Sequence, residues 1–139
     1  MKKVLSCVLI LAALLALVQP ALVAGASGIE PLFDQAQQAE ISMYISSTGK
    51  ANIVLTGVGK LAVTKINAIT YLEKKVGGSW QRVNIGTYSN VWEYQVNDNV
   101  LSKGYDWQLS TRGEYRAVVR FAFYGSKVEY ITDTVTKTY

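Results

Sequence analysis

The sequence predicts an all-β fold, an antiparallel β-sandwich of seven to eight short strands. From residue 40 onward Val, Ile, Thr and Tyr are frequent, and glycine recurs between the segments that they form. These are the residue types of strands and of turns. No proline follows Pro31, so no later residue lacks the backbone N–H that a strand ladder needs. Short strands in this number are typical of a sandwich or a barrel.

Residues 1–26 are predicted to be a cleaved export signal. Lys2 and Lys3 precede an apolar stretch over 4–18, and Ala24 and Ala26 are the small residues that a signal peptidase accepts. A membrane anchor needs about 18 to 20 consecutive apolar residues, more than this stretch provides. We therefore expect cleavage after Ala26, secretion to the extracellular space and no stable membrane anchor afterwards.

The remaining chain of about 113 residues has little net charge and no thiol. Cys7 leaves with the signal, and it lies near the start of the apolar stretch, whereas the cysteine of a lipoprotein box follows that stretch. Twelve basic and 10 acidic residues remain, a net charge of +2, and the basic residues are scattered along the sequence. This balance argues against a nucleic-acid partner. The chain also lacks an Asn-x-Ser/Thr sequon, and the absence of disulfides and of sequons indicates a bacterial source. A lysine-led signal on a protein without disulfides indicates a Gram-positive one.

The exported part divides into an N-terminal arm, 27–40, and one sandwich domain, 41–139. The arm shows no apolar alternation. Alternation and turn residues predict strands near 41–47, 51–57, 61–75, 79–86, 90–96, 105–110, 114–124 and 127–138.

Three local patterns are sharper than the rest. The pair Gly77-Gly78 supplies the positive φ angles that a two-residue hairpin turn requires. The pair Gly125-Ser126 marks a second hairpin near the end of the domain. In the strand over 115–124, which precedes this second pair, the odd-numbered positions are all apolar and the even-numbered ones include two arginines, which predicts one buried face. The residues expected in the core are Tyr115, Ala117, Val119, Phe121 and Phe123.

The segment over 109–118 carries a resemblance. Leu109 lies six residues before Tyr115, with a turn glycine, Gly113, between them and an alternating strand after them. This pattern resembles the E–F corner of fibronectin type III and other immunoglobulin-like sandwiches. The resemblance implies an immunoglobulin-like fold over 41–138, in which the Tyr115 hydroxyl bonds to the backbone a few residues upstream. It departs from the family in having no proline-rich start, and Trp80 lies outside the position of the usual buried tryptophan.

A second resemblance depends on three short motifs. Leu72-Glu73-Lys74-Lys75, Gly78-Ser79-Trp80 and Gly113-Glu114-Tyr115-Arg116 are together similar to small secreted proteins of uncharacterised families in Clostridia-like Gram-positive bacteria.

The residue inventory argues against an enzyme. No histidine or cysteine lies after residue 26, which removes imidazole bases, thiol nucleophiles and the nitrogen and sulfur ligands of metals. Asn97-Asp98-Asn99 is rich in oxygen ligands but reads as a turn, since the remaining ligands of a calcium loop are missing. We expect no catalytic, cofactor-binding or metal-binding residues. The acidic residues that form no recognisable catalytic spacing are Glu73, Glu93, Asp98, Asp106, Glu114, Glu129 and Asp133.

Nine tyrosines and three tryptophans are the one positive indication of function. Trp92, Tyr94 and Trp107 are the candidates for stacking on a ligand, and they serve either the core or a binding surface. The leading hypothesis is a secreted non-enzymatic sandwich that acts in binding or surface association, with a protein or a polysaccharide as its partner. A carbohydrate-binding module that uses these three residues is the alternative, and a secreted antimicrobial or inhibitor protein is a further one.

Overall fold

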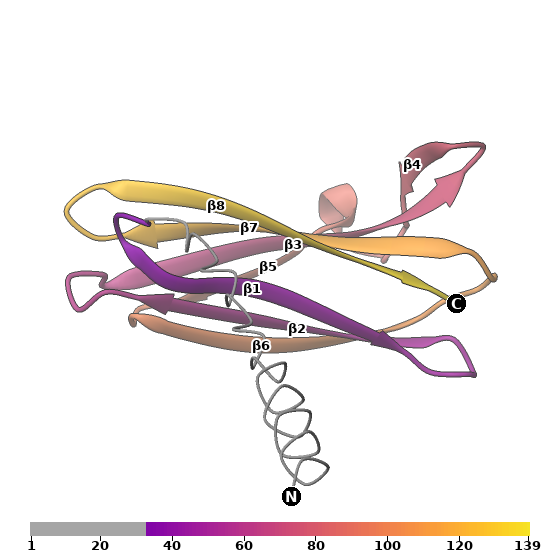
Figure 1. Ribbon diagram of the computed structural model, residues 1–139, viewed down its shortest axis with the longest axis horizontal. Helices are drawn as coiled ribbons and strands as arrows, with labels where there is room; N and C mark the ends of the chain where they lie inside the picture. The colour runs from indigo at the N-terminus through magenta and orange to yellow at the C-terminus, as the bar shows by residue number, and fades with distance from the viewer. Residues whose placement is uncertain (1–32) are drawn as a thin grey trace, which may run out of the picture. The chain divides into compact units, whose positions relative to one another are not determined.

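Two antiparallel sheets face each other in the computed structural model, which describes residues 33–139 (Figure 1). This arrangement confirms the predicted all-β sandwich. The first sheet has the order β1-β2-β6. The second has the order β4-β3-β7-β8, and β5 pairs with residues 66–70 of β3, along the same edge whose residues 73–76 pair with β4. The elements are β1 (Ala36–Ile45), β2 (Lys50–Gly59), β3 (Lys65–Val76), β4 (Ser79–Arg82), the 3₁₀ turn η2 (Tyr88–Asn90), β5 (Trp92–Val96), β6 (Val100–Gln108), β7 (Glu114–Tyr124) and β8 (Val128–Thr138).

The eight strands correspond to the eight predicted segments, and β7 has the predicted bounds of 114–124. Four boundaries differ from the prediction by more than two residues, and one of them is the end of β4, which lies at Arg82 instead of 86. Residues 36–40, expected in the N-terminal arm, belong to β1, and β6 begins at Val100 instead of 105. Residues 61–64 form a turn before β3 instead of its first part. The predicted export signal, 1–26, lies outside the described residues.

Both predicted hairpins are confirmed. Gly77 and Gly78 join β3 to β4 with φ angles of +57° and +83°, which only glycine adopts without a steric penalty. The second hairpin joins β7 to β8, and there the Gly125 N–H donates to the Lys127 carbonyl oxygen at 3.1 Å. Residues 97–99 form the predicted turn between β5 and β6.

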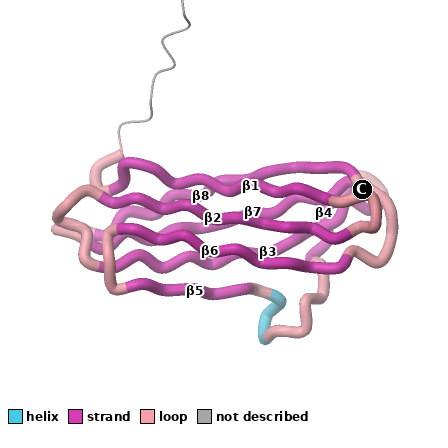
Figure 2. Tube along the Cα trace, turned by 90° about the horizontal axis from the view of Figure 1, so that it is seen from below, coloured by secondary structure: helices cyan, strands magenta, loops and turns pink. Residues whose placement is uncertain are grey.

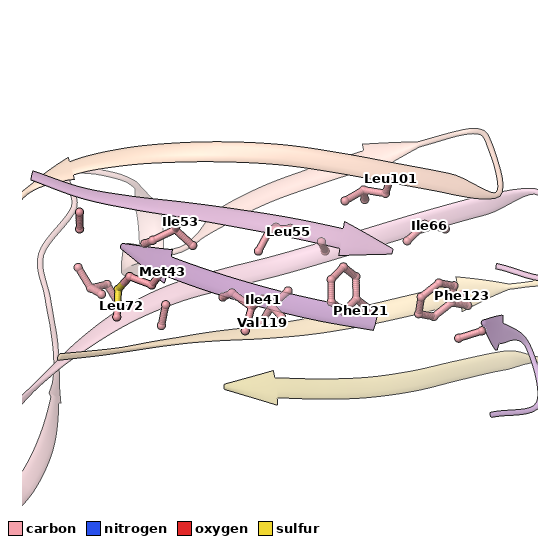
Figure 3. Close-up of a cluster of buried hydrophobic side chains, with 14 of the residues drawn as sticks. Ile41, Met43, Ile53, Leu55, Ile66, Leu72, Leu101, Val119, Phe121 and Phe123 are labelled. Carbon is pink, nitrogen blue, oxygen red and sulfur yellow. The ribbon is translucent and has the colours of Figure 1, made fainter. Parts of the chain in front are cut away.

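The core lies between the two sheets and is centred on the inward face of β7 (Figure 3). All five residues predicted for that face, from Tyr115 to Phe123, are at most 2% exposed, which confirms the prediction. The rings of Phe121 and Phe123 lie 5.9 Å apart. Ile53 and Leu55 of β2, also completely buried, belong to the same core and come from the opposite sheet.

The predicted tyrosine corner is present. The Tyr115 hydroxyl donates a hydrogen bond of 2.7 Å to the carbonyl oxygen of Thr111, four residues upstream. The ring is 2% exposed, and Leu109, at 4%, is buried beside it in the same core cluster. The hydrogen bond therefore fixes the path of the chain from β6 into β7.

We expect Tyr115→Phe to lower the free energy of unfolding by about 0.5 to 1.5 kcal/mol, because it removes one buried hydrogen bond and leaves the packing intact. Urea unfolding followed by tryptophan fluorescence measures the change. Tyr44→Phe is the matched control, since Tyr44 is 69% exposed and should show no loss. Equal stability of Tyr115→Phe and the unchanged protein would contradict the structural role of the corner.

Carboxylates of β8 hold the first residues of β1. The Glu129 carboxylate accepts hydrogen bonds from the backbone N–H groups of Asp34, Gln35 and Ala36, at 2.7 to 3.0 Å. Asp133 accepts another from the N–H of Ile41, at 2.9 Å. Burial raises the pKa of Glu129, but the three N–H donors together outweigh it, so the pKa lies below its ordinary value. The ionised form is therefore the one that stabilises the fold.

Because folding lowers the pKa of Glu129, its ionised carboxylate stabilises the folded state fully at pH values above the ordinary pKa of about 4.5. This stabilisation is lost as the pH falls through the pKa that Glu129 has in the folded state. We expect Glu129→Gln to lower the free energy of unfolding by about 1 to 2 kcal/mol at pH 7. The difference from the unchanged protein should shrink below pH 4.5. Urea unfolding at several pH values measures it, with the exposed Glu40→Gln as control. A difference independent of pH would show that ionisation of Glu129 contributes nothing.

Candidate functional site

Four aromatic side chains close one edge of the sandwich, where β5 runs beside β6 (Figure 2). Trp92 and Tyr94 come from β5, and Tyr105 and Trp107 come from β6. We call these four residues the edge aromatic cluster. All four are half-buried and pack against the core from between the sheets. The alternation of both strands places them there, because Glu93, Gln95 and Asp106 point to the solvent instead.

The cluster is built on two ring contacts. Trp92 stacks on Tyr105, with a centroid distance of 4.9 Å and an interplanar angle of 11°. It also meets Trp107 edge to face at 6.2 Å. The ammonium group of Lys103 lies 4.8 Å from the ring centre of Tyr94 and 5.6 Å from that of Tyr105. Of the three predicted stacking residues, Trp92 and Trp107 thus share a direct contact, and Lys103 links Tyr94 to the cluster.

Trp92, Tyr94 and Trp107 are the residues predicted to stack on a ligand. They lie on the inner side of the edge, in contact with the core, and their role in ligand binding stays a prediction. Tyr105 belongs to the edge aromatic cluster and Lys103 contacts two of its rings, but neither residue was predicted from the sequence as part of a site. The period-2 spacing of Lys103, Tyr105 and Trp107 along β6 is the signal that could have found them.

A pocket of about 310 Å³ opens where Trp107 meets the tyrosine corner. We call it the corner pocket. Trp107, Val83, Leu109 and Tyr115 give it apolar walls. The side chains that supply polar atoms are Lys74, Asn84, Gln108, Ser110 and Thr111. An aromatic wall with several hydrogen-bonding groups around it is the usual composition of a small-ligand site.

Hydrogen bonds within the fold hold most of these polar groups in place. The Lys74 ammonium donates to the Thr111 hydroxyl at 2.5 Å. The Gln108 amide donates to the carbonyl oxygen of Thr48 at 2.8 Å, and Asn84 Oδ1 accepts from the N–H of Gly86 at 2.9 Å. The corner pocket is therefore largely preformed, which reduces the ordering cost of binding.

Each of the seven carboxylates considered as catalytic candidates forms an ion pair or accepts a hydrogen bond outside the corner pocket. Neither the corner pocket nor a second hollow on the outer face of the larger sheet is lined by Asp or Glu. Over residues 33–139, no three metal-ligating side chains converge. The pairs are Glu73 with Arg116, Glu93 with Asn67, Asp98 with the Asn99 N–H, Asp106 with Lys50, Glu114 with Lys75, Glu129 with the start of β1, and Asp133 with the Ile41 N–H.

No protein-family model matches the chain, and no curated protein matches its sequence. Within the described part of the chain, none of the helical segments has the length and apolar character that crossing a membrane requires.

The hydroxyl of Tyr105 is buried without a hydrogen-bond partner among residues 33–139, and burial raises its pKa. Because a buried hydroxyl that makes no bond only costs desolvation, we expect Tyr105→Phe to keep the stability or raise it by up to about 1 kcal/mol. Urea unfolding compares it with Tyr115→Phe, the same change at a bonded hydroxyl. A loss of stability equal to that of Tyr115→Phe would show that the Tyr105 hydroxyl is bonded after all.

Proposed function

We propose that this chain is a secreted, non-enzymatic binding domain with an immunoglobulin-like fold, and that its ligand is a carbohydrate bound in the corner pocket. The lysine-led apolar segment and the small residues at Ala24 and Ala26 support secretion. The single observation that carries the ligand class is the position of Trp107 in the wall of a pocket rich in polar groups.

Strand order supports the immunoglobulin-like part of the proposal. In constant-type immunoglobulin sandwiches, strands A, B and E share one sheet and strands C, F and G share the other. Here β1, β2 and β6 stand in the places of A, B and E, and β3, β7 and β8 in those of C, F and G. Strands β4 and β5 extend the second sheet beyond β3, where variable-type domains carry their additional strands. The Tyr115 bond lies at the corner between the strands that correspond to E and F.

The residue chemistry supports binding over catalysis. No imidazole or thiol follows residue 26. None of the seven candidate carboxylates lines either hollow, so neither hollow offers a carboxylate as a general acid or base.

A carbohydrate fits the composition of the corner pocket. A sugar ring presents an apolar C–H face, which packs on an aromatic ring, and hydroxyl groups around its rim, which need hydrogen-bond partners. Trp107 supplies the ring. The Ser110 hydroxyl and the Asn84 amide nitrogen make no hydrogen bond to residues 33–139, so both are available to a ligand.

The test uses the full chain, expressed in an exporting bacterium and recovered from the medium, where the mature protein should begin at Ser27. We expect it to bind a neutral polysaccharide from a glycan panel with a change in tryptophan fluorescence. Trp107→Ala should weaken that binding about tenfold or more, since it removes the stacking surface. The matched control is Trp80→Ala, which changes a tryptophan outside the pocket and should bind within about twofold of the unchanged protein.

Because Trp107 also packs against the core, Asn84→Ala provides a second variant at an exposed position. It should weaken binding without changing the unfolding curve. A protein that stays in the cell would overturn the proposed secretion. Indifference to the whole panel, or unchanged binding by both pocket variants, would overturn the proposed ligand site.

A further inference from the structure

The outer face of the larger sheet gathers five basic side chains that are scattered in the sequence. The antiparallel register places Arg120 of β7 opposite Ile69 of β3, and Arg116 and Arg82 on either side of Glu73. Lys65 and Lys75 lie on the same face, at the two ends of β3. On β3 and β7 the intervening residues face the core, so their four cations point outward, and Arg82 lies on the same face as its register partner Glu73. We call this surface the basic face.

Aromatic rings support the arginines of the basic face. The guanidinium carbon of Arg82 lies 3.5 Å from the ring centre of Tyr71, and that of Arg116 lies 4.5 Å from the ring centre of Trp80. A ring beneath a guanidinium covers one face of it and leaves the N–H donors in its plane available. Stacking therefore orients these groups without using up their capacity to bind an anion.

The five cations differ in how far they are neutralised. Arg116 forms a short ion pair with Glu73, at 2.5 Å, and Arg82 lies at 3.9 Å from the same carboxylate. Lys75 pairs with Glu114 at 3.1 Å. Arg120 is exposed and forms no ion pair within residues 33–139. Lys65 likewise forms no ion pair within these residues, and its ammonium group lies 3.7 Å from the ring centre of Tyr124. Arg120, Lys65 and the weakly paired Arg82 are therefore the charges of the basic face that remain open to an acidic ligand.

A hollow of about 250 Å³ lies between these two arginines. We call it the arginine hollow. Ile69, Tyr71 and Val118 supply an apolar lining, and Thr132 of β8 adds a hydroxyl beside Arg120, its register partner. No carboxylate lines the hollow. It therefore combines an apolar surface, two guanidinium groups and the hydroxyl groups of Thr132 and Tyr71.

We propose that the arginine hollow binds an acidic sugar unit of an anionic polysaccharide. The face of the sugar ring packs on the apolar lining, its carboxylate accepts hydrogen bonds from Arg120 and Arg82, and the Thr132 hydroxyl bonds to a ring hydroxyl. This inference goes beyond the proposed function, because it names a second site and an acidic ligand class. The arginine hollow and the corner pocket share no lining residue.

The length of the basic face favours a polymer as the ligand. Lys65 and Lys75 are ten residues apart on β3, a distance of about 33 Å along the strand, and Arg120 and Arg116 lie between them in register. Three carboxylates, Glu73, Glu93 and Glu114, share this face with the cations. A chain with widely spaced anions avoids them more easily than a nucleic acid, whose phosphates are dense.

The test measures binding of the full chain to polygalacturonate, a uronic acid polymer, at low ionic strength by isothermal titration calorimetry. We expect binding that weakens with added salt, with no binding to neutral dextran. Arg120→Gln should weaken binding about tenfold, and the double variant Arg82→Gln with Arg120→Gln should abolish it. Arg112→Gln is the matched control, because it removes the same charge at an exposed position outside the hollow.

Three results would overturn the inference. These are the absence of polygalacturonate binding, an equal loss in Arg112→Gln and Arg120→Gln, and tighter binding of single-stranded DNA than of polygalacturonate at the same salt concentration. Trp107→Ala separates this site from the corner pocket, since it should leave polygalacturonate binding within about twofold of the unchanged protein. Unfolding curves of every variant confirm that the fold is retained.

Discussion

The burial of the inward face of β7 is the interaction on which the rest of the structure depends. This strand lies between β3 and β8 in its own sheet, and its odd-numbered side chains meet β1 and β2 across the core. Phe121 and Phe123 are completely buried, and burial of each such ring contributes about 1.5 to 3 kcal/mol. No disulfide can assist within residues 27–139, because they contain no cysteine. Apolar packing around β7 therefore holds the two sheets together, with the hydrogen bonds from the N–H groups of β1 to Glu129 and Asp133 of β8 as the polar contribution.

The distance along the chain between interacting residues explains how much of the fold could be predicted from the sequence. The bounds of β7, the turn at Gly77-Gly78 and the Tyr115 corner each depend on residues close together in the chain, so a pattern within about ten positions reveals them. The start of β1 was missed because it is held by hydrogen bonds that its backbone N–H groups donate to the carboxylate of Glu129, a residue far away in the sequence. The beginning of β6 was missed because Lys103 and Gly104 interrupt its apolar alternation.

The candidate sites could likewise be predicted only in part from the sequence. The sequence singled out Trp92, Tyr94 and Trp107 as one group, and the structure brings them together at one edge. Their direction toward the core depends on the pairing of β5 with β3 and on the approach of β5 to β6, which the sequence does not show. The basic face was hidden for a related reason. Arg82, Arg116 and Arg120 are scattered along the chain, and only the register of β4 and β7 on β3 brings them onto one surface.

The two sites differ in how binding is coupled to stability. Trp107 packs against the core and lines the corner pocket, so one ring serves both the closed edge of the sandwich and the proposed ligand. Arg120 is exposed, forms no ion pair within residues 33–139 and lies 5.7 Å from the ring centre of Tyr130. On the same outer face, Glu73 and Arg116 neutralise each other in an ion pair. Loss of the Arg120 charge therefore leaves the stability of the fold unchanged. Any change at Trp107, in contrast, alters the packing of the edge as well as the pocket.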